Sequence, residues 1–244
     1  MTACSPQTDQ TSSAAPVLTM ATSADFPPYG YVDTSSGTEK IIGFDIDIAT
    51  TIATQLGYTL EITNIDFNGL IPALLSKRAD FVMAGMVPTA ERKENVDFSN
   101  IYYEAKSSIV SKQGSGLSTE ASLNGRKVGV QLGSVEEETA KQISGATIIP
   151  LNSLGSIVQE IKIGRIDAAI IENTVAKAYV SINSGLEFHT IASNGETGSA
   201  IAFPKGSELT KKFNLELQKM QSSGIIEQLI NTWFGENSPA YTKP

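Results

Sequence analysis

The fold of this chain is decided by "GFDIDIATTIATQLGYTLEITNI", residues 43–65. In its first half, apolar residues recur every four positions from Phe44 to Leu56, which is the spacing of one face of a helix. Gly57 follows, and glycine is common just past the end of a helix. The second half, "TLEITNI", alternates apolar and polar residues as a strand does. We therefore expect a helix that stops at Gly57 and leads into a strand.

The flanking segments extend this helix and strand into an alternating series. Residues 17–22, "VLTMAT", alternate apolar and polar side chains and precede a proline-rich loop. Residues 67–80 form an amphipathic pattern, and residues 81–86, "FVMAGM", predict a buried strand. A series of strands separated by helices predicts a parallel sheet with helices on its faces.

A second α/β block follows the Gly/Ser-rich stretch 113–125. Its expected elements are a strand and turn at 126–134, a helix at 135–144, a strand at 146–151, a helix at 154–167, and a strand passing into a helix at 168–183. A last strand and one or two amphipathic helices are expected within 198–235.

Two such blocks predict two lobes. Ligands of open α/β sheets bind beyond the carboxyl ends of strands, so the ligand is expected in the cleft between the lobes.

The composition excludes several functional classes. The chain has 244 residues and a net charge of -8, which argues against a nucleic-acid partner. It has one cysteine, Cys4, and one histidine, His189, so we expect no internal disulfide, no zinc site and no cofactor. Its apolar runs are all shorter than the roughly 18 residues that span a bilayer.

The N-terminal segment predicts an anchor. Residues 1–16 are rich in Ser, Thr, Gln and Pro and lack the apolar mass needed for packing, which indicates a flexible tether. "MTAC" resembles the end of a bacterial lipobox, in which the cysteine becomes lipidated. We expect Cys4 to bind the protein to membrane lipid, on the outer face of the cell membrane or in the periplasm, although a stray cysteine would give the same letters.

Arginine in the first turn of a helix needs an explanation, because the helix dipole disfavours a cation there. In "AGMVPTAERKENVDFS", residues 84–99, Thr89 is the expected N-cap and Arg92 lies in the first turn after it. A guanidinium beside free backbone N–H groups makes a site for a carboxylate, which would offset that placement. A solvated surface arginine is the alternative.

Six motifs then occur in order: "GFDIDIA" (43–49), "FNGLIPAL" (67–74), "AGMVPTAERKENVDFS" (84–99), "KVGVQLGS" (127–134), "GRIDAAIIEN" (164–173) and "GIIEQLINTWFG" (224–235). Together they resemble the solute-binding proteins of bacterial polar amino-acid ABC importers (family 3, cluster F). The resemblance implies a type II periplasmic-binding-protein fold, with two Rossmann-like lobes joined by two hinge strands. On this basis we expect lobe 1 to contain residues 17–110 and 202–244, lobe 2 to contain residues 111–201, and the hinges to lie near 108–112 and 199–203. It also implies that the lobes close on one free amino acid and deliver it to a membrane permease.

The resemblance assigns ligand contacts to particular residues. Arg92 and Ser134 would bind the α-carboxylate, and Glu172, where the family usually has Asp, would bind the α-ammonium together with the Gly85 carbonyl. Val87 stands where the family often has Ser or Thr, so a hydroxyl contact is lost there and only the backbone N–H remains. Without the resemblance, Glu172 could equally be a solvated carboxylate at a helix start.

The ligand side chain is harder to predict. Phe26 and Phe67 would sandwich it, although both could be core residues, and two aromatic faces suit a guanidinium. Ser23 replaces the Asp of many basic-amino-acid binders, and Gln131 replaces the Lys of some glutamine binders. Other acids near the expected cleft are Glu136, Asp45 and Asp25. We expect arginine or lysine, with glutamine or another polar amino acid as the alternative.

Other functional classes remain open at this point. An enzyme of the cyclohexadienyl-dehydratase kind has the same fold, but such chemistry needs an acid or base in the cleft. His189 falls in an expected peripheral strand, and Glu172 is expected to be paired with an ammonium. We therefore expect a binding protein without catalytic residues. The sequence of the domain does not exclude a sensor that feeds a kinase or a channel.

Overall fold

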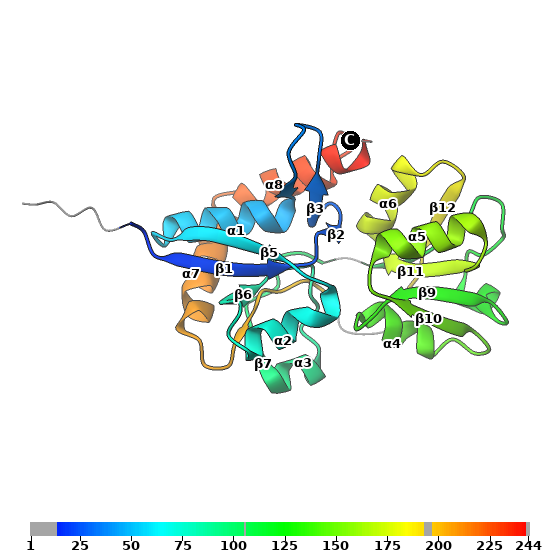
Figure 1. The fold of residues 1–244 in the computed structure, drawn as a ribbon, viewed down its shortest axis with the longest axis horizontal. Helices are drawn as coiled ribbons and strands as arrows, with labels where there is room; N and C mark the ends of the chain where they lie inside the picture. Colours follow the sequence, from blue (N-terminus) through cyan, green and yellow to red (C-terminus); the bar gives the residue numbers. More distant parts are fainter. Residues whose placement is uncertain (1–13, 105, 193–196, 243–244) are drawn as a thin grey trace, which may run out of the picture.

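The computed structural model describes residues 14–104, 106–192 and 197–242. Its β-strands form two five-stranded sheets and one small three-stranded sheet. Figure 1 shows the two large sheets side by side, each with its own helices, so that the chain forms two lobes. Cys4 and most of the expected tether lie outside the described residues.

The first sheet has the strand order β5-β1-β6-β13-β7. Its strands are β1 (Val17–Thr22), β5 (Thr59–Asn64), β6 (Phe81–Val82), β7 (Val96–Phe98) and β13 (Ala202–Pro204). The strands β5, β1 and β6 are parallel, as the alternating pattern predicts. β13 returns from the C-terminal part of the chain and pairs antiparallel with both β6 and β7.

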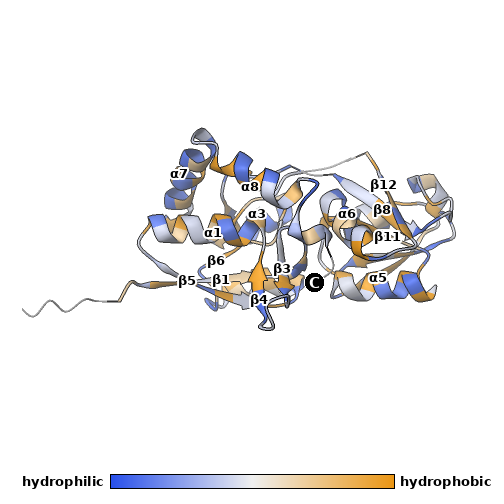
Figure 2. Ribbon diagram, turned by 90° about the horizontal axis from the view of Figure 1, so that it is seen from above, coloured by the Kyte–Doolittle hydropathy of each residue, from blue (hydrophilic) through white to orange (hydrophobic). Residues whose placement is uncertain are grey.

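Five helices accompany this sheet in the first lobe: α1 (Phe44–Gln55), α2 (Leu70–Leu75), α3 (Ala90–Asn95), α7 (Glu208–Ser222) and α8 (Ile225–Phe234). α1 buries Phe44, Ile48 and Ile52 completely, which confirms the apolar face expected from their spacing. Figure 2 shows α7 with hydrophilic and hydrophobic residues on different faces. Its buried Phe213 lies 4.9 Å from Phe81 and 5.1 Å from Phe203, between ring centroids, and so joins the helix to the sheet.

A small antiparallel sheet and three short 3-10 helices complete the description. The small sheet consists of β2 (Asp25–Phe26), β3 (Gly30–Asp33) and β4 (Lys40–Ile42), and none of these three strands is predicted from the sequence. The 3-10 helices are η1 (Phe67–Gly69), η2 (Glu120–Leu123) and η3 (Pro239–Tyr241). Trp233 on α8 is buried, and its indole nitrogen donates a hydrogen bond of 2.8 Å to Asp47.

The second sheet has the strand order β10-β9-β11-β8-β12. Its strands are β8 (Ser107–Lys112), β9 (Lys127–Gln131), β10 (Thr147–Leu151), β11 (Ala168–Glu172) and β12 (Leu186–Thr190), and its helices are α4 (Val135–Lys141), α5 (Leu154–Ile163) and α6 (Asn173–Ile182). β12 is an edge strand and holds His189, as expected. We refer to this sheet and its helices as the second lobe.

The chain passes between the lobes twice, and the two passages pair with each other. Ser99 donates a backbone hydrogen bond to Ile201, and Tyr102 and Tyr103 exchange backbone hydrogen bonds with Ser199. The expected hinge at 108–112 differs from this arrangement, because those residues belong to β8 and pair with β11 on one side and β12 on the other. The pairing therefore puts residues 107–110 in the second sheet, so the second lobe begins four residues before the expected boundary at residue 111.

Two predicted elements are shorter than expected, for local reasons. The helix predicted over 67–80 becomes η1 and α2 and ends at Leu75, and Lys77 adopts a positive φ of 57° just beyond it. The strand predicted over 81–86 pairs only at Phe81 and Val82, because the chain then turns at Gly85 with a φ of 59°. That turn carries the backbone toward the cleft.

Candidate functional site

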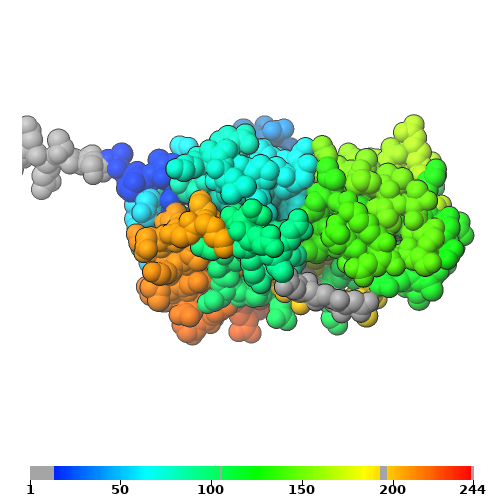
Figure 3. Space-filling model, turned by 90° about the horizontal axis from the view of Figure 1, so that it is seen from below, coloured from blue at the N-terminus to red at the C-terminus, as the bar shows by residue number. Residues whose placement is uncertain are grey.

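A cavity of about 380 Å³ lies where the two lobes meet, a size that suits a small molecule. Figure 3 shows the lobes in contact along this boundary. Residues of both lobes line it: Phe26, Phe67, Gly85, Val87, Thr89 and Arg92 from the first, and Gln131, Ser134, Glu136, Glu138 and Glu172 from the second. Four lining residues are acidic, Glu120, Glu136, Glu138 and Glu172, whereas two are basic, Arg92 and Lys106. The cavity therefore favours a ligand with a net positive charge.

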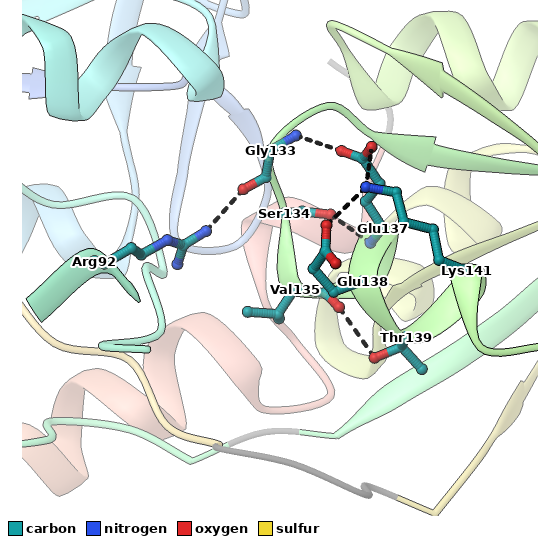
Figure 4. Close-up of polar contacts among 8 residues, drawn as sticks. All are labelled: Arg92, Gly133, Ser134, Val135, Glu137, Glu138, Thr139 and Lys141. Carbon is teal, nitrogen blue, oxygen red and sulfur yellow. Dashed lines mark hydrogen bonds and ion pairs between the residues drawn. The ribbon is translucent and has the colours of Figure 1, made fainter. Parts of the chain in front are cut away.

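Arg92 enters the cavity from the N-terminal turn of α3. The Thr89 hydroxyl accepts a hydrogen bond of 3.3 Å from the Arg92 backbone N–H, which confirms the expected N-cap. The guanidinium donates 2.7 Å to the Val87 carbonyl and 2.8 Å to the Gly133 carbonyl of the second lobe (Figure 4). It also lies over the Phe67 ring, 5.4 Å from the centroid. Burial lowers the pKa of Arg92, against the opposing effect of Glu136 and Glu91.

Two helix N-termini of the second lobe form the opposite wall. Ser134 is the N-cap of α4, where its hydroxyl accepts a hydrogen bond of 3.1 Å from Glu137 N. Glu172 is the N-cap of α6, and its carboxylate accepts from Thr174 N, from the Thr174 hydroxyl at 2.6 Å and from Val175 N at 2.9 Å. Such groups stabilise a carboxylate at a helix start. This wall therefore supplies a hydroxyl and a fixed acid.

Two of the acids that line the cavity, Glu172 and Glu136, lose hydration by burial. Burial raises the pKa of Glu172 to about 7, although the hydrogen bonds from Thr174 and Val175 oppose the shift. Burial also raises the pKa of Glu136, against hydrogen bonds that include one from the Ser107 hydroxyl. A cation placed between these groups would lower both pKa values, because it favours their charged forms.

Glycine is required at position 85 by the aromatic wall. A side chain there would begin 2.6 Å from the Phe26 ring, and the positive φ of 59° disfavours other residues as well. The Gly85 N–H donates 2.9 Å to Asp45, and the Tyr102 hydroxyl donates 2.9 Å to the other oxygen of the same carboxylate. Asp45 thus fixes the turn from behind.

Two expected ligand residues do not line the cavity. Asp45 is completely buried and has both carboxylate oxygens bonded to protein, so the expectation that it faces the ligand is wrong. Ser23 is buried too, and its hydroxyl donates a hydrogen bond of 2.7 Å to Asp25. Asp25, the further acid expected near the cleft, does not line the cavity either. The remaining expected contacts do: Phe26, Phe67, Gly85, Val87, Arg92, Gln131, Ser134, Glu136 and Glu172.

The cavity is also lined by residues that the sequence does not link to the ligand: Lys106, Ser107, Glu120, Val135, Glu138, Thr139, Gln142, Ala192, Thr197, Gly198 and Ser199, together with Thr89, which is expected only as a helix cap. The run of three acids at 136–138 was the available sign for Glu138. Lys106 and Ser199 lie on the passages between the lobes, and no periodic pattern identifies such positions.

Within the described residues, no group of three or more His, Cys, Asp or Glu residues is arranged to hold a metal ion. Over the same residues, none of the helices combines the length and the apolar character that crossing a bilayer requires.

Comparisons with known proteins agree with this geometry. The family model described as "Bacterial extracellular solute-binding proteins, family 3" matches residues 18–236. The "Arginine-binding extracellular protein ArtP" of Bacillus subtilis (strain 168) is 45% identical over 239 residues, which cover 96% of this chain and 92% of that protein.

Two solved structures extend the comparison to the fold. An ancestral arginine-binding protein bound to arginine has a TM-score of 0.84 and 40% identity, and the match covers 91% of this chain and 100% of that one. An ancestral arginine-binding protein bound to glutamine has a TM-score of 0.84 and 41% identity, with 90% and 98% covered.

Proposed function

Because the chain belongs to family 3 of the bacterial extracellular solute-binding proteins, we propose that it captures free L-arginine for an amino-acid ABC importer. The fold is the two-lobed one of that family, and the relatives compared above are binding proteins. The protein would hold the amino acid between its lobes and deliver it to the membrane permease, with no chemical change to the ligand.

One observation carries this proposal: across the boundary between the lobes, the cavity opposes the half-buried Arg92 to the buried Glu172 and the half-buried Glu136. A free amino acid has a carboxylate and an ammonium on the same carbon. Arg92 and the Ser134 hydroxyl would bind the α-carboxylate, and Glu172 with the Gly85 carbonyl would bind the α-ammonium. Charge-assisted hydrogen bonds of this kind are about twice as strong as neutral ones.

The rest of the cavity favours a cationic side chain. A guanidinium would lie between Phe26 and Phe67, where aromatic faces attract cations. Its positive charge would approach the carboxylate of Glu136. This carboxylate belongs to the wall formed by the second lobe and accepts a hydrogen bond from the Ser107 hydroxyl. Val87 and Gln131 would contribute neutral contacts, a backbone N–H and an amide, on either side. Lysine fits the same charges but lacks the planar, stacking head group of arginine.

Glutamine is the second candidate, because an ancestral arginine-binding protein that is 41% identical to this chain has been solved with glutamine bound. Its neutral amide would gain nothing from Glu136, so we expect glutamine to bind more weakly than arginine.

The lipid anchor is a separate proposal: the protein acts outside the cytoplasm, and we propose that Cys4 attaches it to the membrane. Fractionation of cells that express the wild type or Cys4→Ser would test the anchor.

The ligand proposal is tested by calorimetry on protein that has been unfolded and refolded to remove co-purified ligand. Arginine, lysine, glutamine and histidine are titrated in turn, and we expect arginine to bind tightest. Tight binding of glutamine with no heat from arginine would overturn the proposal. Mass spectrometry of ligand recovered after denaturation would show arginine unchanged, whereas a converted product would indicate an enzyme.

A further inference from the structure

Asp25 joins the two lobes on the side of the cavity next to Phe26. It lies on β2 in the first lobe, and its carboxylate accepts a hydrogen bond of 2.8 Å from the backbone N–H of Leu154 in the second lobe. The amide nitrogen of Gln131, also in the second lobe, lies 3.2 Å and 3.4 Å from the two carboxylate oxygens. The Asp25 carbonyl accepts a hydrogen bond of 2.8 Å from the Tyr179 hydroxyl.

The bond to Leu154 has a physical reason. Leu154 is the first residue of the ten-residue helix α5, whose first N–H groups have no partner within the helix. Ser153 caps α5 from within the second lobe and accepts from Ser156 N, so it leaves Leu154 N free for a group outside the lobe. A carboxylate is favoured there by the helix dipole. Asp25 supplies that carboxylate from the first lobe.

Other hydrogen bonds between the lobes are fewer, although Lys177 on α6 also lies over the Tyr241 ring of η3, 4.3 Å from its centroid. Among the described residues, the hydrogen bonds between the lobes that do not involve Asp25 run from Arg92 to the Gly133 carbonyl and from Asn152 to Asp66. Asn152 and Asp66 lie at an exposed position, where such bonds are weak. Within the first lobe, the Ser23 hydroxyl holds one oxygen of Asp25 at 2.7 Å and so fixes its direction.

We propose that Asp25 is a latch that holds the lobes closed, and that Ser23 acts on Asp25 rather than on the ligand. The Gln131 amide nitrogen is a further partner of Asp25 from the second lobe. Because Asp25 precedes Phe26, closing the latch also sets the aromatic wall of the cavity. Asp25 is thus a positioning residue, and the inference rests on the proposed function only in assuming that the lobes close around a ligand.

The test measures lobe closure separately from ligand identity. Spin labels are placed at Thr54→Cys and Gln159→Cys, exposed positions on α1 and α5, in a chain that also carries Cys4→Ser. Pulsed electron resonance then gives the distance between the lobes, with and without arginine. Loss of charge-assisted hydrogen bonds predicts that Asp25→Ala lowers the closed-to-open ratio roughly tenfold. The dissociation constant for arginine would rise by about the same factor, because the binding-competent state is less populated.

Two further variants keep the result interpretable. Asp33→Ala makes the same charge change on β3 of the first lobe, where the carboxylate bonds only to Ser35 among its described neighbours, and it should alter neither distance nor affinity. Tyr179→Phe removes only the hydroxyl that bonds to the Asp25 carbonyl, and it should open the lobes by a smaller factor. Circular dichroism confirms that each variant is folded, and Tyr179→Phe carries the test if Asp25→Ala does not fold.

The outcomes separate the two proposals. Unchanged distances in Asp25→Ala and Tyr179→Phe, with and without arginine, would overturn the latch. Longer distances in Asp25→Ala combined with a wild type that does not bind arginine would support the latch and overturn the arginine proposal.

Discussion

The two walls of the cavity carry opposite charges, and the backbone binds each charge differently. Backbone carbonyls accept hydrogen bonds from the cation, and backbone N–H groups donate hydrogen bonds to the anion. On the first wall, the Arg92 guanidinium donates to the carbonyls of Val87 and Gly133. On the second, the Glu172 carboxylate accepts from the N–H groups of Thr174 and Val175. Neither side chain is among the ion pairs of the described residues.

This difference explains how a cleft can keep buried charges ready for a ligand. Peptide dipoles offset part of the cost of burying a charge, but they leave it without a full counter-charge. A zwitterion brings one counter-charge to each wall. A direct Arg92–Glu172 pair would instead have to be broken before the ligand could bind.

Arg92→Ala should reduce the affinity for arginine more than any other substitution proposed here, because it removes the positive charge of the first wall. It would leave the ligand carboxylate unpaired in a desolvated cavity, and removing one partner of a buried ion pair costs about 3–5 kcal/mol. We expect calorimetry to show a loss of arginine affinity of roughly a hundredfold or more. Arg78→Ala is the matched control, because Arg78 is an exposed arginine of the same lobe that bonds to Ser76. Wild-type affinity in Arg92→Ala would exclude Arg92 from the site.

The second wall predicts a pH dependence of binding. Burial raises the pKa of Glu172 to about 7 in the ligand-free protein, so at lower pH the group is protonated before the ligand arrives. A bound ammonium favours the carboxylate and lowers this pKa, so binding releases a proton. We therefore expect the affinity to rise with pH up to about 7, by about tenfold per unit at most, and then to level off.

Calorimetry at several pH values, in buffers of different ionisation enthalpy, measures the released proton. Glu172→Gln should bind more weakly above pH 7, by roughly tenfold, because it loses a charge-assisted hydrogen bond, and its affinity should depend little on pH. His189→Asn controls for the single histidine, since histidine side chains ordinarily titrate in this range. A pH dependence that persists in Glu172→Gln but disappears in His189→Asn would contradict this assignment.

Glu136→Gln should change the selectivity of the second wall, that is, the ratio of the affinities for arginine and glutamine, rather than the binding of the α-amino-acid group that both ligands share. The carboxylate would lose its attraction for the guanidinium, so we expect arginine affinity to fall by up to about tenfold while glutamine affinity stays the same. Glu160→Gln makes the same change on α5 of the second lobe, outside the cavity lining, where the carboxylate pairs with Arg165 at 3.3 Å, and it should leave the ratio nearly constant. Equal losses for arginine and glutamine would show that Glu136 does not contact the side chain.

Local features were predictable from the sequence because they depend on near neighbours. The strand at 17–22, the helix end before Gly57 and the Thr89 cap each rest on residues within one turn or one strand. The ordered motifs then allowed Arg92, Ser134 and Glu172 to be expected in one cleft, and all three line the same cavity.

What the sequence could not supply depends on how distant segments pack. Asp45 and Asp25 both lie near expected ligand residues in the sequence. Their sequence neighbours do not show that Asp45 accepts a hydrogen bond from the Gly85 N–H, or that Asp25 accepts one from the Leu154 N–H. Likewise, the alternating "SSIVSK" pattern does not reveal that its strand pairs with β11 on one side and β12 on the other, inside the second sheet.

The position of Trp233 has a practical consequence for optical experiments. It is the single tryptophan of the sequence, it is hydrogen-bonded to Asp47, and it is not among the residues that line the cavity. Its fluorescence should therefore report the integrity of the packing between α8 and α1 rather than contact with an amino acid. A sensor built from this protein needs an added dye near the cleft, and the native emission then serves as an internal check that the first lobe is folded.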